Sequence, residues 1–226
     1  MVSLLFEDNH CLVVDKPAGL PSQPDDSGDA CLVDLVAADL KQRYNKPGNV
    51  YVGLVHRLDR PTSGVVLIAK TSKAAARLSA QFHDGIVEKT YLAVVEGHPL
   101  IEEGTWVDLL VKDRQRNVVR TVGSNERDSV EARVSFRVVE LFDRTTLMEL
   151  KPLTGRSHQL RVQLASRGLP IIGYRKYGAK STLIARDGRP RVALHAYQLK
   201  FNHPTRGEAL EVLAPLPADW PKSRGV

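Results

Sequence analysis

The stretch HRLDRPTSG, residues 56–64, runs directly into the apolar run VVLIA, residues 65–69. Such a run is typical of a buried strand. Asp59 lies between Arg57 and Arg60 ahead of it, so its carboxylate can be held ionised where an anionic ligand would also dock. Asp and Ser also open ordinary turns, and Gly64 can supply a positive φ. On spacing alone the ordinary turn is the stronger interpretation, so a second signal is needed.

The second signal is KPLTGRSHQLRV, residues 151–162, about a hundred residues further along. It follows a predicted strand at residues 145–150, and its Thr-Gly turn leads into a predicted helix. A helix start of this kind directs backbone N–H groups and side-chain donors towards an anion. The first turns of this helix are expected to carry Arg156, His158, Gln159 and Arg161.

With both segments in view, the chain resembles the RluA-type family of RNA pseudouridine synthases. The resemblance runs nearly from end to end and rests on five motifs in the same order. Any one of them alone would be weak evidence. They are DKPAGL at 15–20, the 56–64 stretch, EKTYLAVVEG at 88–97, TGRSHQLR at 154–161, and LHA at 194–196 with His-Pro at 203–204.

The pattern of strands and turns predicts an α+β fold, with a mixed, largely antiparallel sheet flanked by helices. The resemblance implies the pseudouridine synthase catalytic fold, with a long bent sheet and a central cleft. Helices are predicted at 34–44, at 73–83 with Ser72 as the N-cap, and at about 157–166. Strands are predicted at 12–14, 51–58, 64–70, 90–96, 105–111, 117–122, 130–141, 145–150, 191–201 and 208–212.

Pseudouridine formation breaks the C1′–N1 bond of a uridine and rejoins C1′ to C5, which requires a carboxylate that stays ionised in a dry pocket. The resemblance assigns Asp59 as that carboxylate, acting as nucleophile or base, and Arg156 as its buried partner. It also implies that Tyr91 packs against the target base and that Leu194 forms an apolar wall on the other face. A uridine in folded RNA must leave its stack, and Arg57 is the candidate to hold it or fill its place.

Other residues of these motifs have a structural interpretation beside the functional one. His56 and His158 are expected to be oriented hydrogen-bonding groups and not general bases. Asp15 and Lys16 are either a charged pair that braces the cleft or part of a surface turn. The family commonly has Gly-Asp where this chain has Gly173-Tyr174, which leaves the loop conformation and substrate preference open.

The net charge of +6 is unevenly distributed. Residues 151–191 contain ten Lys or Arg and the single acid Asp187, so this basic stretch is +9 and the rest of the chain is −3. The stretch is either a solvated face or a docking surface for a phosphate backbone, and its overlap with residues 154–161 favours docking. Arg175, Lys176 and Lys180 are the expected RNA contacts. Tyr174 and Tyr177 either stack on unpaired bases or pack internally.

At 226 residues, with 42% hydrophobic and 26% charged residues, the chain is expected to form one catalytic domain over residues 1–226. A separate N-terminal RNA-binding domain is not expected, because the first motif begins at residue 15. No apolar run reaches the roughly 18 residues that span a bilayer, and no secretory signal is visible. We therefore expect a cytoplasmic monomer that acts on structured rRNA or tRNA, without a small-molecule cofactor. Cys11 and Cys31 are expected to be reduced thiols, with neither zinc nor a disulfide.

Two other functional classes stay open at this point. One is a non-catalytic RNA-binding or ribosome-assembly protein on the same fold, because a fold does not fix a function. The other is an enzyme that removes a base or cleaves a phosphodiester with Asp59 and His56. Hydrolysis of that kind commonly needs a metal, and the spacing of the histidines and cysteines shows no convincing ligand set.

Overall fold

The computed structural model describes residues 2–124, 126–185 and 188–221. Arg186 and Asp187, which were counted in the basic stretch, lie outside the described residues. The chain divides into two compact units, which are described separately here. Unit 1 comprises Met1–Lys89 and Ala196–Pro217, and unit 2 comprises Thr90–His195 and Ala218–Val226. The boundary therefore falls inside two strands, and each unit contains two segments of the chain.

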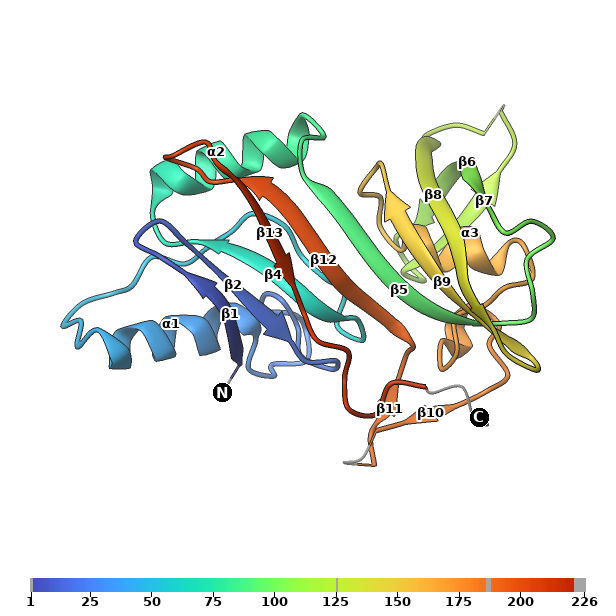
Figure 1. The fold of residues 1–226 in the computed structure, drawn as a ribbon, viewed down its shortest axis with the longest axis horizontal. Helices are drawn as coiled ribbons and strands as arrows, with labels where there is room; N and C mark the ends of the chain where they lie inside the picture. The colour runs from blue at the N-terminus through green and yellow to red at the C-terminus, as the bar shows by residue number, and fades with distance from the viewer. Residues whose placement is uncertain (1, 125, 186–187, 222–226) are drawn as a thin grey trace. The chain divides into compact units, whose positions relative to one another are not determined.

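Unit 1 is built on a sheet whose strand order is β1-β2-β4-β12, with β13 paired to β12 and β3 paired to β4 (Figure 1). The pairs β1–β2, β2–β4, β3–β4 and β12–β13 are antiparallel. The strands are β1 (Ser3–Glu7), β2 (Cys11–Lys16), β3 (Gly53–Leu54), β4 (Ser63–Ala69), β12 (Leu194–Asn202) and β13 (Ala209–Leu213). The helices are α1 (Leu32–Arg43) and α2 (Ser72–His83).

The core of unit 1 forms around β4, which is buried along its whole length. Val65 and Leu67 of β4 share one apolar cluster with Ala74 and Leu78 of α2. Side chains alternate between the two faces of a strand, and the residues of β4 on the other face are buried too. A strand covered on both faces reads as a continuous apolar run, which is why the run at 65–69 predicted this strand.

Gly64, the second residue of this buried strand, has a φ of +114°, as its place after the turn predicted. A Cβ built at Gly64 would lie 2.1 Å from the backbone carbonyl oxygen of Ala196. Only a glycine therefore allows β4 to approach β12 this closely. The residue that ends the 56–64 stretch is required by sheet packing as well as by the turn.

Unit 2 is built on a sheet with strand order β5-β9-β8-β6-β7. The pairs β5–β9, β9–β8, β8–β6 and β6–β7 are antiparallel. The strands are β5 (Glu88–Glu96), β6 (Glu103–Asp113), β7 (Val118–Val122), β8 (Val130–Leu141), β9 (Thr145–Pro152), β10 (Leu183–Ile184) and β11 (Pro190–Arg191). Helix α3 (Gln159–Ala165) contacts β6 and β7, and a short 3₁₀ turn, η1 (Arg175–Tyr177), contacts α3.

The predicted α+β class and the large, largely antiparallel sheet are confirmed. Strand β1 was not predicted, and the strand predicted at 51–58 shrinks to the two residues of β3. The N-cap of α2 is Thr71, whose Oγ1 accepts a hydrogen bond from the N–H of Ala74 at 3.1 Å, so the choice of Ser72 was wrong. Across the described residues, none of the helices has the length and apolar character needed to cross a bilayer.

Candidate active site

Asp59 lies in unit 1, in the turn that precedes β4, where the sequence placed it. Its side chain is partly buried, and the preceding Leu58 is only 3% exposed. The N–H of Thr62 donates to the carbonyl oxygen of Asp59 at 2.9 Å, which closes the predicted turn. The carboxylate is therefore carried on a short, hydrogen-bonded segment that enters a fully buried strand.

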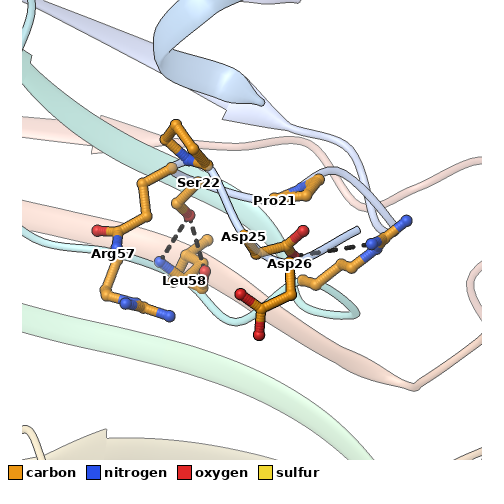
Figure 2. A pocket seen from close by; sticks show the side chains of 9 residues that line it. Pro21, Ser22, Asp25, Asp26, Arg57 and Leu58 are labelled. Atoms are coloured by element: carbon orange, nitrogen blue, oxygen red, sulfur yellow. Dashed lines mark hydrogen bonds and ion pairs between the residues drawn. The ribbon is translucent and has the colours of Figure 1, made fainter. Parts of the chain in front are cut away.

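Arg57, two residues earlier, is exposed and lines a pocket of about 250 Å³ in unit 1 (Figure 2). The rest of the lining comes from residues 21–26, Leu58 and Arg60. Two carboxylates, Asp25 and Asp26, and two guanidinium groups, Arg57 and Arg60, line this pocket, and Arg60 lies 3.7 Å from Asp25. The lining therefore offers both hydrogen-bond acceptors and hydrogen-bond donors.

Tyr91 and Leu194 belong to unit 2. Tyr91 lies on β5 opposite Leu150 of β9, is partly buried, and packs against the main apolar cluster of the unit. Leu194, at the start of β12, is 3% exposed and is a member of that cluster. The structure thus places both residues at the same core.

The expectation that Arg156 is buried is wrong. Arg156 is exposed, and its Nε donates to the carbonyl oxygen of Glu131 at 2.9 Å. The reason is the start of α3: His158 takes a left-handed conformation with φ 52°, so the helix begins at Gln159 and Arg156 stays in the turn before it. The helix was predicted to begin about two residues too early.

The buried arginine of this motif is Arg161, which is 3% exposed. Its guanidinium carbon lies 4.5 Å from the centre of the Tyr174 ring, and its Nη1 donates to the Tyr174 hydroxyl. A buried guanidinium acts in a low dielectric, where its charge is screened far less than at the surface. The signal was present in the sequence, because Arg161 is a cation inside the otherwise uncharged run Leu160–Leu164.

His56 has the structural role that the sequence suggested. Its Nε2 accepts a hydrogen bond from the N–H of Leu67 at 2.9 Å, and its ring stacks on Phe82 at 4.6 Å. Burial, together with the charge of Lys89, lowers the pKa of His56 to about 3. His158 is likewise engaged, since its Nδ1 lies 2.7 Å from the hydroxyl of Tyr177. A neutral, stacked His56 ties the segment before Asp59 to β4.

Lys16 is not part of a surface turn. Its side chain is fully buried, and its Nζ donates to the carbonyl oxygens of Leu20 at 2.7 Å and Pro17 at 3.0 Å. A buried ammonium group has three N–H donors, and these backbone carbonyl oxygens act as their acceptors. Burial raises the pKa of Asp15, and the nearby Lys16 charge partly offsets that effect. Lys16 is thus a buried cation that holds the exposed or half-buried residues 17–20 of the first motif.

The predicted RNA contacts Arg175, Lys176 and Lys180 are all exposed, on or just after η1. Lys176 also donates to the carbonyl oxygen of Asn117 at 2.8 Å. Tyr174, in contrast, is 9% exposed and belongs to the core, so of the two alternatives left open for this tyrosine the structure supports internal packing. The hydroxyl of Tyr177 accepts from the N–H of Val119 at 3.0 Å, which favours internal packing for this tyrosine too.

The structure also assembles three potential metal ligands in unit 1 that their spacing did not reveal: Asp8, Cys11 and His203 offer ligand atoms within 4.8 Å of one another. Their hydrogen bonds already occupy these atoms. The Nε2 of His203 lies 2.6 Å from Oδ2 of Asp8. Burial and the neighbouring Asp8 raise the pKa of the Cys11 thiol to about 12. Cys11 and Cys31 are free, as predicted.

Comparison with known proteins places these observations in a family. The model of the family described as RNA pseudouridylate synthase matches residues 10–166. Ribosomal large subunit pseudouridine synthase D of Xanthomonas campestris is 39% identical over 96% of this chain and 67% of its own length. The dual-specificity RNA pseudouridine synthase RluA of Escherichia coli O157:H7 is 37% identical over 94% of this chain and 92% of its own length.

The solved structure of human RNA pseudouridylate synthase domain containing 4 is similar as well, with 26% identity and a TM-score of 0.79 over 96% of this chain and 89% of that one. None of these proteins is described as a non-catalytic RNA-binding protein. The family match therefore includes Asp59 in unit 1 and the whole of α3, with Arg161, in unit 2. The chain therefore belongs to the RNA pseudouridylate synthase family, whose members isomerise uridine to pseudouridine in RNA.

Proposed function

We propose that this chain isomerises specific uridines in ribosomal RNA, with transfer RNA as the alternative substrate class. The support is the description of its relatives: the Xanthomonas campestris protein is named for the large ribosomal subunit, and the Escherichia coli protein is named for dual specificity. The cytoplasm, where these RNAs are made and modified in a bacterium, is the proposed compartment. A monomeric state and the lack of a small-molecule cofactor stay predictions.

The two units are proposed to act as one catalytic domain. The observation that supports this is the family match over residues 10–166, which crosses the boundary between Lys89 and Thr90. A family defined by its reaction therefore shares sequence with both units. Neither unit is proposed to work alone.

Asp59 is proposed as the nucleophile or base of the reaction, and this assignment carries the proposed function. It rests on the position of Asp59 in a hydrogen-bonded turn before a fully buried strand, within the region that matches the family. Tyr91 is proposed to contact the target base and to assist proton transfer at C5, while Leu194 contributes apolar surface. These roles require no metal and no redox step, because the reaction only exchanges one glycosidic bond for another.

Among the arginines, Arg161 and not Arg156 is proposed as the one that turnover requires. The reaction needs a cation whose field is not screened by water, and Arg161 is buried while Arg156 is exposed. Arg57 is proposed to hold the flipped nucleotide, because it is exposed at the rim of a polar pocket. Arg175, Lys176 and Lys180 are proposed to contact phosphates of the RNA, since all three are exposed.

The test is isomerisation by the purified chain, measured as tritium release from RNA that carries C5-labelled uridine. Asp59→Asn should abolish turnover and leave RNA affinity nearly unchanged, because the amide keeps the shape but cannot act as nucleophile or base. Asp84→Asn, which removes the same charge from an exposed residue at the end of α2, is the matched control. Activity of Asp59→Asn within tenfold of wild type, about 1.4 kcal/mol in barrier height, would refute the assignment.

The RNA class is tested in cells. Pseudouridine is mapped across all RNA in cells with and without this protein, and a plasmid that carries Asp59→Asn serves as the control for catalysis. Loss of a site in the large-subunit RNA, restored by wild type only, supports the proposal. Loss confined to transfer RNA would replace ribosomal RNA by the alternative class.

A further inference from the structure

We propose that Ser22 is a positioning residue for the catalytic turn, and that it forms one side of a clamp that fixes both neighbours of Asp59 in the chain. The clamp is defined as residues 16–22, which begin at the last residue of β2 and hydrogen-bond to Leu58 and Arg60. This inference rests on the proposed role of Asp59. It assigns a function to a serine that lies just beyond the DKPAGL motif.

The first side of the clamp is the Ser22 hydroxyl, which bonds to both backbone polar groups of Leu58. The hydroxyl donates to the carbonyl oxygen of Leu58 at 2.7 Å and accepts from the N–H of Leu58 at 3.2 Å (Figure 2). Both residues are nearly buried, at 4% and 3% exposure. The hydroxyl thereby satisfies a donor and an acceptor that would otherwise be buried without a partner.

The second side of the clamp holds the residue that follows Asp59. The carbonyl oxygen of Arg60 accepts from the N–H of Gly19 at 2.8 Å and from Nζ of Lys16 at 3.3 Å. The Nε of Arg60 returns a bond to the carbonyl oxygen of Gly19 at 3.0 Å. The buried Lys16 ammonium also binds two carbonyl oxygens of the clamp itself, so the segment is held to its own strand end.

Asp59 therefore sits between two residues whose backbones are both bonded to the same seven-residue segment. A clamp on both flanks limits how far the Cα of Asp59 can shift or rotate, whereas a clamp on one flank would leave a hinge on the other. Misplacement of a reacting group by about 1 Å can cost on the order of 100-fold in rate. The Ser22 side of the clamp depends on a single side chain, so it can be removed without disturbing the Arg60 side.

Serine suits this position because one small side chain must donate and accept at the same time. Alanine can do neither. Threonine keeps the hydroxyl, and cysteine keeps the number of heavy atoms but is a weaker donor and acceptor. If Ser22 positions Asp59 through its two bonds, the rate should follow the hydrogen-bonding capacity of the side chain at this position and not its volume.

The experiment measures single-turnover isomerisation at saturating RNA together with the Kd for RNA, for wild type and for Ser22→Ala, Ser22→Thr and Ser22→Cys. We expect Ser22→Ala to lower the rate constant roughly 10- to 100-fold. Kd should stay within about threefold, because Ser22 is only 4% exposed and its hydroxyl is already bonded to both backbone groups of Leu58. Ser22→Thr should recover most of the rate, and Ser22→Cys should fall between Thr and Ala. The folded fraction of each variant is measured by circular dichroism at the assay temperature, and rates are expressed per folded molecule.

Thr146→Val is the control for loss of stability without loss of positioning. Thr146 is fully buried in unit 2, and its Oγ1 donates to the carbonyl oxygen of Gly97 at 2.7 Å, so the variant also deletes a buried hydroxyl that binds a backbone carbonyl. Its rate constant should stay within about twofold of wild type even where its unfolding midpoint falls as far as that of Ser22→Ala.

The clamp is overturned if Ser22→Ala keeps a rate within twofold of wild type. It is also overturned if Ser22→Ala and Thr146→Val lose rate to the same extent for the same decrease in unfolding midpoint. If Ser22→Ala does not fold, the rates of Ser22→Cys and Ser22→Thr are compared instead, and equal rates for these two variants overturn the clamp. Wild type and Asp59→Asn are measured alongside. If wild type is inactive, or if Asp59→Asn is active, the proposed function itself is refuted. If Asp59→Asn is inactive while Ser22→Ala is fully active, only the clamp is refuted.

Discussion

The guanidinium of Arg161 lies over the ring of Tyr174, with 4.5 Å between the guanidinium carbon and the ring centre, and donates to the hydroxyl of the same tyrosine. In this chain a neutral hydroxyl and an aromatic face thus hold a buried cation.

The first prediction compares the two arginines of the TGRSHQLR motif. Arg161→Ala should lower the single-turnover rate by at least 100-fold, about 2.7 kcal/mol in barrier height, because it removes a buried charge. Arg156→Ala should stay within about threefold, because only an exposed side-chain bond to Glu131 is lost. Tritium release at saturating RNA measures both. If Arg156→Ala lost turnover while Arg161→Ala stayed active, Arg156 and not Arg161 would be the arginine that turnover requires.

The second prediction separates the hydroxyl of Tyr174 from its ring. Tyr174→Phe keeps the aromatic face and should lower the free energy of unfolding by about 1–3 kcal/mol, the usual cost of losing a buried hydrogen bond to a charged group. Tyr174→Ala also removes the ring from the core and should cost about 3–5 kcal/mol. Urea denaturation of both variants measures the difference. Equal losses would mean that the ring contributes nothing to the packing.

The third prediction concerns pH and His56. The folded-state pKa of about 3 lies below the ordinary value of 6.5, so the unfolded chain binds the proton more readily. The stability that neutral His56 provides is therefore fully present above pH 6.5 and is lost as the pH falls from 6.5 towards 3. Between pH 7 and 5 the loss should reach about 2 kcal/mol.

His56→Gln keeps a polar side chain but cannot titrate in this range, so its free energy of unfolding should fall less than that of wild type over the same interval. Urea midpoints at several pH values between 7 and 5 give both curves. Parallel curves for the two proteins would show that His56 does not couple protons to folding.

The features that the sequence predicted well depend on local chemistry. The apolar run at 65–69 reads as a buried strand because β4 is covered on both faces. Gly64 was expected to have a positive φ because it ends a turn. Alternation of apolar and polar residues located β8 at the residues that the structure shows, Val130–Leu141. In each case the residues that determine the structure are neighbours in the chain.

The features that were missed depend on contacts between distant residues or on one backbone angle. Ser22 and Leu58 are 36 positions apart, and Asp8 and His203 are 195 apart, so no spacing rule links them. Arg156 was taken for the buried arginine because the left-handed residue His158 delays the start of α3. The sequence left open whether Tyr174 stacks on RNA bases or packs internally, because its basic neighbours do not show that its ring lies in the core.

The fourth prediction follows from the group Asp8, Cys11 and His203. A chelator should change neither the melting temperature nor the rate, because the carboxylate of Asp8 and the imidazole of His203 already bond to each other. Melting is followed with and without the chelator, then with added Zn²⁺. The rate is measured with a short single-stranded RNA, whose structure does not depend on metal ions, so that the chelator cannot change the rate by unfolding the RNA. A melting temperature that falls with chelator and recovers with Zn²⁺ would identify the group as a metal site.

The last prediction concerns the three exposed cations at η1. If Arg175, Lys176 and Lys180 contact phosphates, replacing all three by alanine should weaken RNA binding and reduce the log–log salt slope by about 0.7 for each lost contact to single-stranded RNA. Turnover at saturating RNA should change far less, because phosphate contacts position the substrate and do not stabilise the reacting base. The result should therefore be opposite to that of Arg161→Ala, which lowers turnover and leaves affinity nearly intact.

Lys41→Ala, Lys46→Ala and Lys73→Ala, combined in one protein, form the matched control for this variant. These three lysines are also exposed, and they lie in unit 1, so the control changes the net charge by the same amount at another place. If the effect arose from net charge alone, both triple variants would lose the same affinity and the same salt slope. Local phosphate contacts instead require that only the η1 variant loses them. Unchanged binding by the η1 variant would show that this part of the basic stretch is a solvated face and that RNA docks elsewhere.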